Sequence, residues 1–89
     1  MPWFVYVLRS DRDGNKYIGC TQDVSKRLAR HQSGGIRSTK NRGPFTLVHV
    51  EEFEGRAGAF AREKFLKTWA GRIELGRILR NKNRSSRSA

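Results

Sequence analysis

Hydrophobic residues form unbroken runs near the start of the chain, and these runs predict strands. Residues 3–8 are six consecutive apolar residues, rich in aromatic and β-branched types, which predicts a strand buried on both faces. Residues 10–15 have the composition of a turn, and residues 16–20 return as a second strand, so the pattern predicts an antiparallel hairpin. Residues 45–53 alternate well enough to predict a third strand.

Between the hairpin and the third strand, the pattern predicts one helix over residues 22–31. Thr21 or Asp23 can cap it, because a short side chain with an oxygen atom satisfies a free N–H group at a helix start. Val24 and Leu28 form its apolar side. The loop that follows is rich in Gly, Ser and basic residues, so we expect it to stay at the surface.

The last third of the chain has helical spacing. A helix over residues 56–70 is predicted from apolar residues at intervals of four, which are Ala57, Ala61, Phe65 and Trp69. Gly71 is expected to interrupt it before a short helix over residues 72–80. The order β-β-α-β-α-α predicts a single α+β domain over residues 1–80. The basic, Ser-rich residues 81–89 are predicted to form a disordered tail.

The net charge of the chain indicates what kind of molecule it binds. Nineteen Lys and Arg against eight Asp and Glu leave a net charge of +11, which attracts phosphate backbones through counterion release. Nucleic acid is therefore the expected partner, and an anionic membrane surface is the competing one. The competitor is less favoured because the basic clusters lack a clear aromatic-faced surface helix.

Cysteine use and hydropathy indicate where the protein works. Cys20 is the only cysteine, which excludes an internal disulfide and a cysteine-rich zinc site. No stretch reaches the roughly 18 apolar residues of a membrane span, and the first apolar run is too short for a signal peptide. We therefore expect a cytoplasmic protein that does not bind a membrane. We also expect it to be a monomer.

Two basic residues of the first predicted helix border its apolar face. At about 100° per residue, Arg27 and His31 project together from positions i and i+4. Lys26 and Arg30 fall on the far side, where we expect solvated charges.

The hairpin register places two tyrosines together. If Arg9 pairs with Lys16, then Tyr6 opposes Gly19, and the phenols of Tyr6 and Tyr17 lie diagonally adjacent on one face. Because Gly19 has no side chain, we expect an open space beside the hydroxyls that a phosphate can enter.

Glu63 has an unusual place for a carboxylate, since Ala59 and Leu66 share its side of the helix. The simpler interpretation is a salt bridge to Lys67 at i+4. Simpler interpretations also exist for the other candidates: sheet aromatics for the tyrosines, a helix-end cap for the histidine and a surface charge for the arginine.

Together these residue types fit the hydrolysis of a phosphodiester. An arginine can hold the phosphate and stabilise charge in the transition state. A Mg²⁺-like ion needs only one or two carboxylates, because phosphate oxygens and water complete its shell. A tyrosine can take a proton from water if its pKa is lowered or if a histidine accepts the proton onward.

The motifs resemble those of the GIY-YIG nuclease superfamily, in particular its small stand-alone bacterial proteins. Residues 5–7 (VYV) and 17–19 (YIG) resemble the paired motif that names the family. The similarity covers roughly residues 3–80 and includes further matches in the same order: Cys20, Thr21, Arg27, Leu28, His31, Thr39, Lys40, Pro44, Leu47, Glu52, Ala59, Glu63, Lys67 and Trp69. It implies a three-stranded antiparallel sheet flanked by helices and an endonuclease that uses Mg²⁺ or Mn²⁺.

The resemblance also implies a role for each candidate. Tyr17 is the general base or its relay, Tyr6 orients the water and Arg27 binds the phosphate. His31 assists the proton transfer, and Glu63 is the metal ligand. One departure concerns an asparagine that many members carry about a dozen residues after the metal glutamate, where this chain has a leucine at position 75 and its nearest asparagine at 81.

No appended recognition domain is visible, so we expect single-stranded, branched or damaged DNA as the substrate, in repair or recombination, rather than a specific duplex sequence. Phosphate contacts position the backbone without reading bases. Phe45 or Trp3, if exposed, can stack on unpaired bases. The residues expected to bind nucleic acid are Gly19, Lys26, Arg30, Arg37, Lys40, Arg42 and Lys67.

Two other functions stay open. The first is a basic nucleic-acid-binding module that keeps the fold and has lost turnover. The second is an interaction module that docks a partner protein through Phe53 and the second predicted helix. A pure binding module has no need of the five candidate catalytic residues together, which favours the enzyme.

Overall fold

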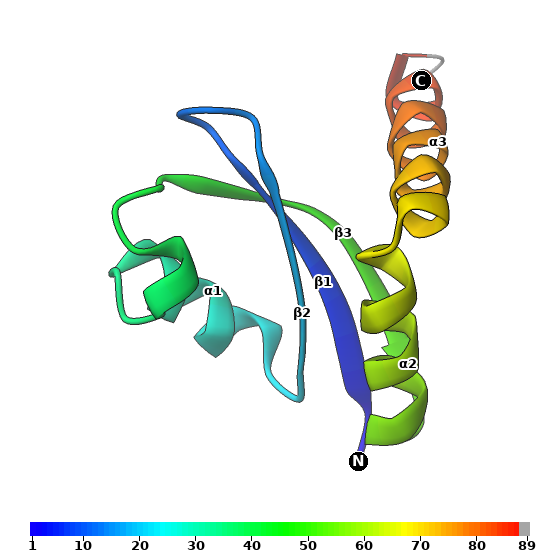
Figure 1. Cartoon of the computed structure of the whole chain (residues 1–89), viewed down its shortest axis with the longest axis horizontal. Coiled ribbons are helices and arrows are strands. Elements are labelled where there is room, and N and C mark those ends of the chain that lie inside the picture. Colours follow the sequence, from blue (N-terminus) through cyan, green and yellow to red (C-terminus); the bar gives the residue numbers. More distant parts are fainter. Residues whose placement is uncertain (88–89) are drawn as a thin grey trace.

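The chain forms the predicted order of strands and helices around one small sheet (Figure 1). The computed structural model describes residues 1–87. A short 3₁₀ turn, Arg37–Thr39, is added in the loop before the third strand. The elements are β1 (Trp3–Ser10), β2 (Lys16–Thr21), α1 (Val24–Gln32), β3 (Phe45–Phe53), α2 (Arg56–Leu66) and α3 (Trp69–Arg87). The α+β fold with a three-stranded antiparallel sheet is thereby confirmed.

The sheet has the strand order β2-β1-β3, so β1 is central and β2 is an edge strand. The predicted hairpin register is correct: Arg9 pairs with Lys16, and Tyr6 pairs with Gly19. A register shift between Val7 and Leu8 interrupts the pairing of β1 with β3. Because side chains alternate between the two faces of a strand, this register decides which side chains share a face.

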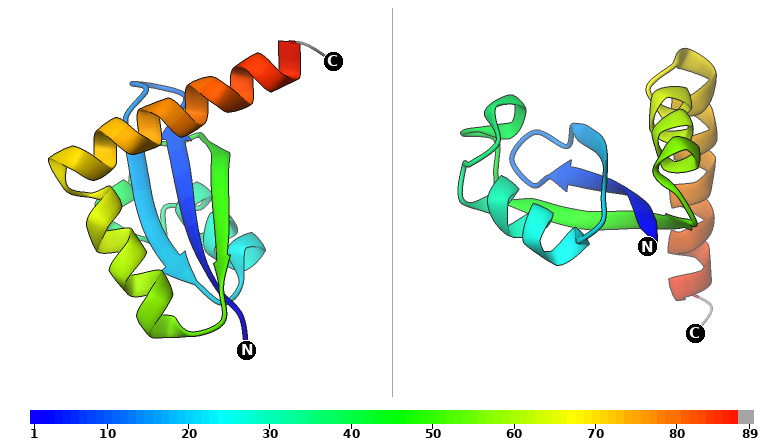
Figure 2. Two further views of the ribbon diagram at one scale, coloured as in Figure 1. Left: turned by 90° about the vertical axis from the view of Figure 1, so that its right-hand side faces the viewer. Right: turned by 90° about the horizontal axis from the view of Figure 1, so that it is seen from below.

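Helices cover both faces of the sheet (Figure 2). On one face Tyr6, Leu8 and Phe45 form a buried cluster with the apolar side of α1. On the other face Val5 and Val7 pack against buried residues of α2 and α3, which are Ala59, Leu66 and Leu75. The unbroken apolar run of β1 is explained by this double burial.

Helix α1 begins two residues later than predicted, ends one residue later, and is hydrogen-bonded to β3 at its end. Asp23 is the cap, since its carboxylate accepts a hydrogen bond from the backbone N–H of Lys26 at 3.0 Å. The side-chain amide of Gln32 donates to the backbone oxygen of Phe45 and accepts from its N–H, at 2.9 and 3.0 Å. These bonds fix the end of α1 against the start of β3.

The break between the last two helices was predicted at the wrong residue. Helix α2 ends at Leu66, and Thr68 caps α3 because its hydroxyl accepts from the N–H of Gly71 at 3.1 Å. Gly71 itself lies inside α3 and lets the helix pass close to α2: a β-carbon there would lie 2.6 Å from the Cα of Leu66. The glycine therefore serves a close helix contact rather than a helix break.

The apolar stripe predicted for the second helix is also wrong. Its members are exposed, with Phe65 39% and Trp69 80% accessible, while Ala59 and Leu66 are the buried residues. The buried face of α2 is therefore the one that also carries Glu63.

The predicted disordered tail is helical over residues 81–87, because α3 continues to Arg87. This part of the sequence contains no Gly or Pro that would end a helix. The predicted tail residues 88–89 lie outside the described residues. Among residues 1–87, no helix combines the length and the apolar character that crossing a membrane requires.

A half-buried arginine joins three elements on the α2 side of the sheet. Arg62 of α2 donates to Glu51 of β3 through Nε at 2.8 Å and to Glu74 of α3 through Nη1 at 2.8 Å. His49 also lies 2.8 Å from Glu51. Burial by itself raises the pKa of Glu51, but hydrogen bonds and charges from Arg62 and His49 lower it overall.

We predict that Arg62→Gln lowers the free energy of unfolding by about 1 to 3 kcal/mol, because hydrogen bonds to a charged group that is mostly buried are lost. The stabilisation that Glu51 provides is fully present above its ordinary pKa of 4.5 and is lost as the pH falls through its lowered pKa in the folded protein. The Arg62→Gln variant has already lost this stabilisation, so its free energy of unfolding should fall less in acid than that of the wild type. Urea denaturation at several pH values measures both effects. Arg77→Gln, an exposed change on α3, is the control; an equal loss of stability in both variants contradicts the prediction.

Candidate active site

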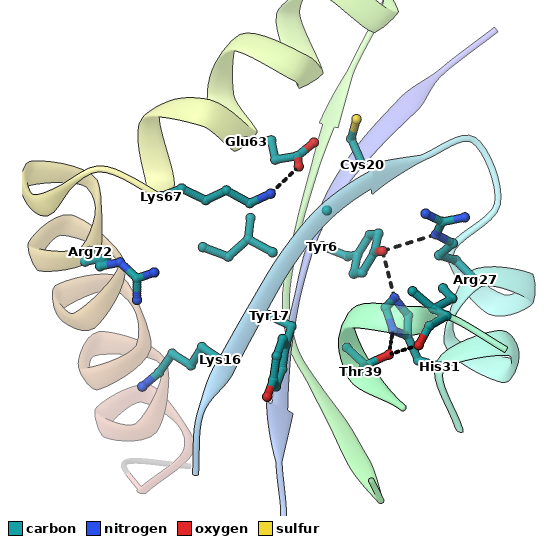
Figure 3. Close-up of a pocket in the computed structure, with 13 residues that line it drawn as sticks. Tyr6, Lys16, Tyr17, Cys20, Arg27, His31, Thr39, Glu63, Lys67 and Arg72 are labelled. Atoms are coloured by element: carbon teal, nitrogen blue, oxygen red, sulfur yellow. Dashed lines mark hydrogen bonds and ion pairs between the residues drawn. The ribbon is translucent and has the colours of Figure 1, made fainter. Parts of the chain in front are cut away.

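A cavity of about 510 Å³ wraps around the edge strand β2 (Figure 3). We call it the β2 cavity. It is lined by all five predicted catalytic side chains, which are Tyr6, Tyr17, Arg27, His31 and Glu63. The hairpin and two helices, α1 and α2, therefore deliver the predicted residues to one place.

The cavity has two sides, separated by the backbone of β2. Tyr6 and Tyr17 lie on the sheet face that α1 covers, whereas Ile18 and Cys20 pack on the face that α2 covers. In Figure 3, β2 passes between Glu63 on one side and the Tyr6 group on the other. Because β2 is an edge strand, both sides open to the same solvent space.

A directed chain of hydrogen bonds runs through the α1 side. Arg27 Nε donates to the Tyr6 hydroxyl at 3.3 Å, and that hydroxyl lies 2.9 Å from His31 Nε2. His31 Nδ1 lies 2.7 Å from the hydroxyl of Thr39, which donates to the backbone oxygen of Ile36 at 3.4 Å. We assign the tautomer from this donation: with the Thr39 proton on that carbonyl, Nδ1 donates to Thr39 and Nε2 accepts from Tyr6.

His31 is held in its neutral form. It is 5% exposed, and its pKa is lowered below the ordinary value of 6.5, first by burial and then by the positive charges of Arg27 and Arg30. A neutral imidazole with Nε2 free to accept a proton is a base aimed at the Tyr6 hydroxyl. The simpler interpretation of His31, a cap at the helix end, does not describe this buried position.

Gly19 does not leave the open space that we expected. The phenol of Tyr6 lies directly over it, and a β-carbon at Gly19 would lie 2.6 Å from Tyr6 Cζ. The glycine therefore provides room for the tyrosine ring rather than for a phosphate.

Tyr17 has different surroundings from Tyr6. Its ring packs edge-on against Phe45, with centroids 5.6 Å apart, and Figure 3 shows its hydroxyl directed away from Tyr6. Among the described residues, no side chain or backbone group forms a hydrogen bond with the Tyr17 hydroxyl. Its connection to the chain of hydrogen bonds is through Phe45, whose ring centre also lies 6.0 Å from that of His31, and through the shared cavity.

Glu63 is the single carboxylate among the residues that line the β2 cavity. Its side chain is 14% exposed, and Oε2 forms an ion pair with Lys67 Nζ at 2.7 Å, as the simpler interpretation predicted. The pKa of Cys20 is raised, first by burial and then by the neighbouring Glu63. Within residues 1–87, no three His, Cys, Asp or Glu side chains are grouped to hold a metal ion.

One carboxylate nevertheless suits an ion that takes most of its ligands from the substrate and water. Glu63 lines the same cavity as Arg27 and Tyr6, across β2 from them, and would be the residue that holds such an ion. The ion would compete with Lys67 for the carboxylate.

The residues expected to bind nucleic acid divide into three groups. Gly19 and Lys67 line the β2 cavity. Lys26 and Arg30 line an adjoining groove together with Arg56, next to Glu63 and Arg27. The remaining three, Arg37, Lys40 and Arg42, line neither the cavity nor this groove.

Some of the expected contacts with nucleic acid are unavailable. The guanidinium of Arg42 lies 3.7 Å from Asp13 in the hairpin turn, which partly neutralises it. Phe45 is 4% exposed in the core and cannot stack on a base. Trp3 is half-buried and lines the adjoining groove, where the guanidinium of Arg56 lies 5.6 Å from its ring centre.

Six lining residues were not among the predicted site residues, and they are Lys16, Ile18, Cys20, Ile36, Thr39 and Arg72. Thr39 and Lys16 had a signal in the sequence, since the first belongs to the family resemblance and the second follows from the hairpin register. Leu75, at the position of the family asparagine, is 2% exposed in the core, whereas Arg72, one helical turn earlier, lines the cavity. The residue at the position of the family asparagine is therefore part of the hydrophobic core and does not line the cavity.

Comparison with known proteins identifies relatives along most of the chain. Residues 2–75 match the family model described as the GIY-YIG catalytic domain. A UPF0213 protein of Halobacterium salinarum is 42% identical over 71% of this chain and 82% of its own length. A UPF0213 protein of Staphylococcus saprophyticus is 34% identical over 81% of this chain and 88% of its own length. A UPF0213 protein of Nitratidesulfovibrio vulgaris is 45% identical over 64% of this chain, which spans 52% of that relative.

The fold is shared with a solved structure. The solution NMR structure of a UPF0213 protein from Bacillus halodurans has a TM-score of 0.55 to this chain and 34% sequence identity, over 88% of this chain and 85% of that one. The match to the catalytic domain, these relatives and the paired tyrosines around β2 agree. The chain belongs to the GIY-YIG family of the nuclease superfamily.

Proposed function

We propose that the protein is a metal-dependent endonuclease that hydrolyses phosphodiester bonds in DNA. The observation that carries the proposal is the directed hydrogen-bond chain from Arg27 through Tyr6 to neutral His31, which opens onto the cavity that contains Glu63. A base, a phosphate-binding cation and a metal-binding carboxylate are the groups that this hydrolysis needs.

In this mechanism Tyr6, rather than Tyr17, handles the proton. His31 Nε2 accepts the proton of the Tyr6 hydroxyl, and the resulting phenolate, stabilised by Arg27 Nε, takes a proton from the attacking water. Thr39 keeps His31 oriented through Nδ1. Tyr17 forms the wall of the cavity and contacts the substrate.

Arg27 has a second task. Its Nε is bonded to Tyr6, which leaves the two terminal nitrogens of the guanidinium to hold phosphate oxygens and to stabilise the charge that develops on them. Glu63 would hold a divalent ion, Mg²⁺ or Mn²⁺, which supplies charge stabilisation at the phosphate. Lys67 then becomes available as another phosphate contact.

The substrate is proposed to be single-stranded or branched DNA, met in repair or recombination in the cytoplasm. The cationic residues around the β2 cavity contact phosphates, and phosphate contacts carry no base information. A second candidate is a binding module without turnover. It is favoured by one observation, the ion pair that occupies Glu63.

We predict that Glu63→Ala abolishes cleavage and preserves or strengthens DNA binding, because a carboxylate near phosphate is removed. End-labelled single-stranded, duplex and branched DNA, incubated with Mg²⁺, Mn²⁺ or EDTA, measures cleavage, and gel shift in EDTA measures binding. Glu54→Ala, an exposed change outside the cavity, is the control. Wild-type protein that binds but never cuts would favour the binding module. Equal loss of binding in the mutant would remove Glu63 from the proposed role.

Tyr6→Phe should reduce kcat roughly 10²- to 10⁴-fold, the usual contribution of general acid–base catalysis, and Tyr17→Phe should reduce it less. Cleavage by the wild type should rise with pH through the pKa of His31, below its ordinary 6.5, because protonated Nε2 cannot accept the Tyr6 proton. Single-turnover cleavage between pH 5 and 8 measures this. A larger effect of Tyr17→Phe would reverse the two roles.

Gly19→Ala should lower kcat by about a hundredfold, since the new methyl group displaces the Tyr6 phenol from His31 and misplaced catalytic groups lose about this much. Gly55→Ala is the matched control, because a β-carbon there meets no atom within 4 Å. Circular dichroism checks that both variants are folded. A fully active Gly19→Ala enzyme is incompatible with the proposed position of Tyr6.

A further inference from the structure

A second basic groove, of about 590 Å³, lies between α3 and the sheet face that α3 covers. We call it the α3 groove. Its cations come from both walls: Arg9 and Lys16 from the hairpin, and Arg80 and Lys82 from α3. None of these four was predicted as a site residue.

The α3 groove continues from the β2 cavity. Lys16 lines both of them, and a smaller pocket of about 190 Å³ between them is lined by Lys16, Arg72 and Gly76. Arg72 also lines the β2 cavity, and Gly76 also lines the α3 groove. The three spaces therefore form one path from Glu63 to the far part of α3.

We propose that the α3 groove binds the single-stranded part of a polynucleotide next to the bond that is cut. The inference rests on the proposed nuclease function and adds to it a direction for the substrate, which leaves the β2 cavity past Lys16 and Arg72 and follows α3.

Charge supports a polyanion on this path. Neither the α3 groove nor the connecting pocket is lined by an acidic residue. Among the described residues, Lys16, Arg72, Arg80 and Lys82 form no ion pair, whereas Arg9 lies 3.9 Å from Asp11, which does not line the groove. Cations without acidic partners along a groove attract phosphates and release counterions when phosphates bind.

Two acids of β3 and α3 are used elsewhere. Glu51 of β3 and Glu74 of α3 both pair with Arg62 of α2. These two acids hold the fold together, and the groove keeps its positive charge.

The shape and lining of the groove favour a single strand over a duplex. Half-buried Val48 and Leu79 give it an apolar wall between its cations. Sites for single strands combine cations that track the backbone with apolar surfaces on which bases rest. A space of a few hundred Å³ is of the size of small-molecule sites, which suits individual nucleotides. A duplex keeps its bases paired and cannot place them there.

Gly76 keeps the path open. A β-carbon at this position would lie 3.5 Å from Arg80 Nη1, an ordinary contact, so a side chain fits there without moving the backbone. It would, however, project into the pocket and the groove that Gly76 lines. Glutamate also favours helix over glycine, so Gly76→Glu is expected to fold.

Three variants on α3, each of which lowers the net charge by one, test the proposal. Arg80→Gln and Gly76→Glu change the groove, whereas Arg77→Gln changes an exposed residue of the same helix that lines neither the groove nor the connecting pocket. Fluorescence anisotropy in EDTA measures binding to a labelled single strand and to the matching duplex at several salt concentrations. Thermal melting confirms that each variant is folded.

For the single strand, Arg80→Gln should make the slope of log Kobs against log salt concentration shallower by about 0.7, the contribution of one phosphate contact. Gly76→Glu should weaken single-strand binding, and Arg77→Gln should leave slope and affinity unchanged. Duplex binding should respond to none of the three.

Equal effects of all three variants would show that only net charge matters, which overturns the groove. A duplex that loses as much affinity as the single strand would overturn the choice of substrate. If the wild type cuts DNA and both groove variants bind the single strand as tightly as the wild type, the α3 groove is not the binding site and the proposed function stands. Failure of the wild type to bind any DNA would reject both.

Discussion

The pairing of β1 with β2 in one register is the constraint on which the site depends. With Tyr6 opposite Gly19, the phenol can lie over the glycine and reach His31 Nε2 at 2.9 Å. A slip of one residue would turn Tyr6 toward α2 and place an aliphatic side chain against α1. The register is secured because β1 is buried on both faces, so each face requires its own set of apolar side chains.

An edge strand divides the cavity into the side of the hydrogen-bonded chain and the side of the carboxylate. Tyr6, His31 and Arg27 lie on the α1 side, and Glu63 lies on the α2 side. A cavity that opens on both sides of a strand needs an edge strand, because an added neighbouring strand would cover the opening. Each side is supported by its own apolar cluster on one face of the sheet.

The large positive charge is distributed unevenly. Arg62 and Arg42 are paired with acids and serve the fold, whereas the cations around β2 and along α3 face open spaces. Burial and nearby positive charge also keep His31 neutral, because a protonated imidazole there would be poorly solvated and repelled. The same basic character thus lowers the pKa of His31 and, in the proposed function, attracts the phosphate backbone.

The sequence by itself determined the order of the elements, the hairpin register and the common direction of Arg27 and His31 on α1, because these follow from local periodicity and from one strand pairing. It did not determine where α2 ends, since a threonine cap is a weak signal beside a glycine, or which face of α2 is buried, since apolar residues occupy two of its faces. Nor did it reveal that Tyr6 fills the space above Gly19, because the sequence shows that a glycine lacks a side chain but does not show which neighbouring side chain occupies that space.

Only the tertiary structure decided that Glu63 and the tyrosines line one cavity on opposite sides of an edge strand, and that Lys16 and Arg72 line the pocket that connects this cavity to α3. Those contacts join residues far apart in the chain, and packing of the helices on opposite faces of the sheet creates them.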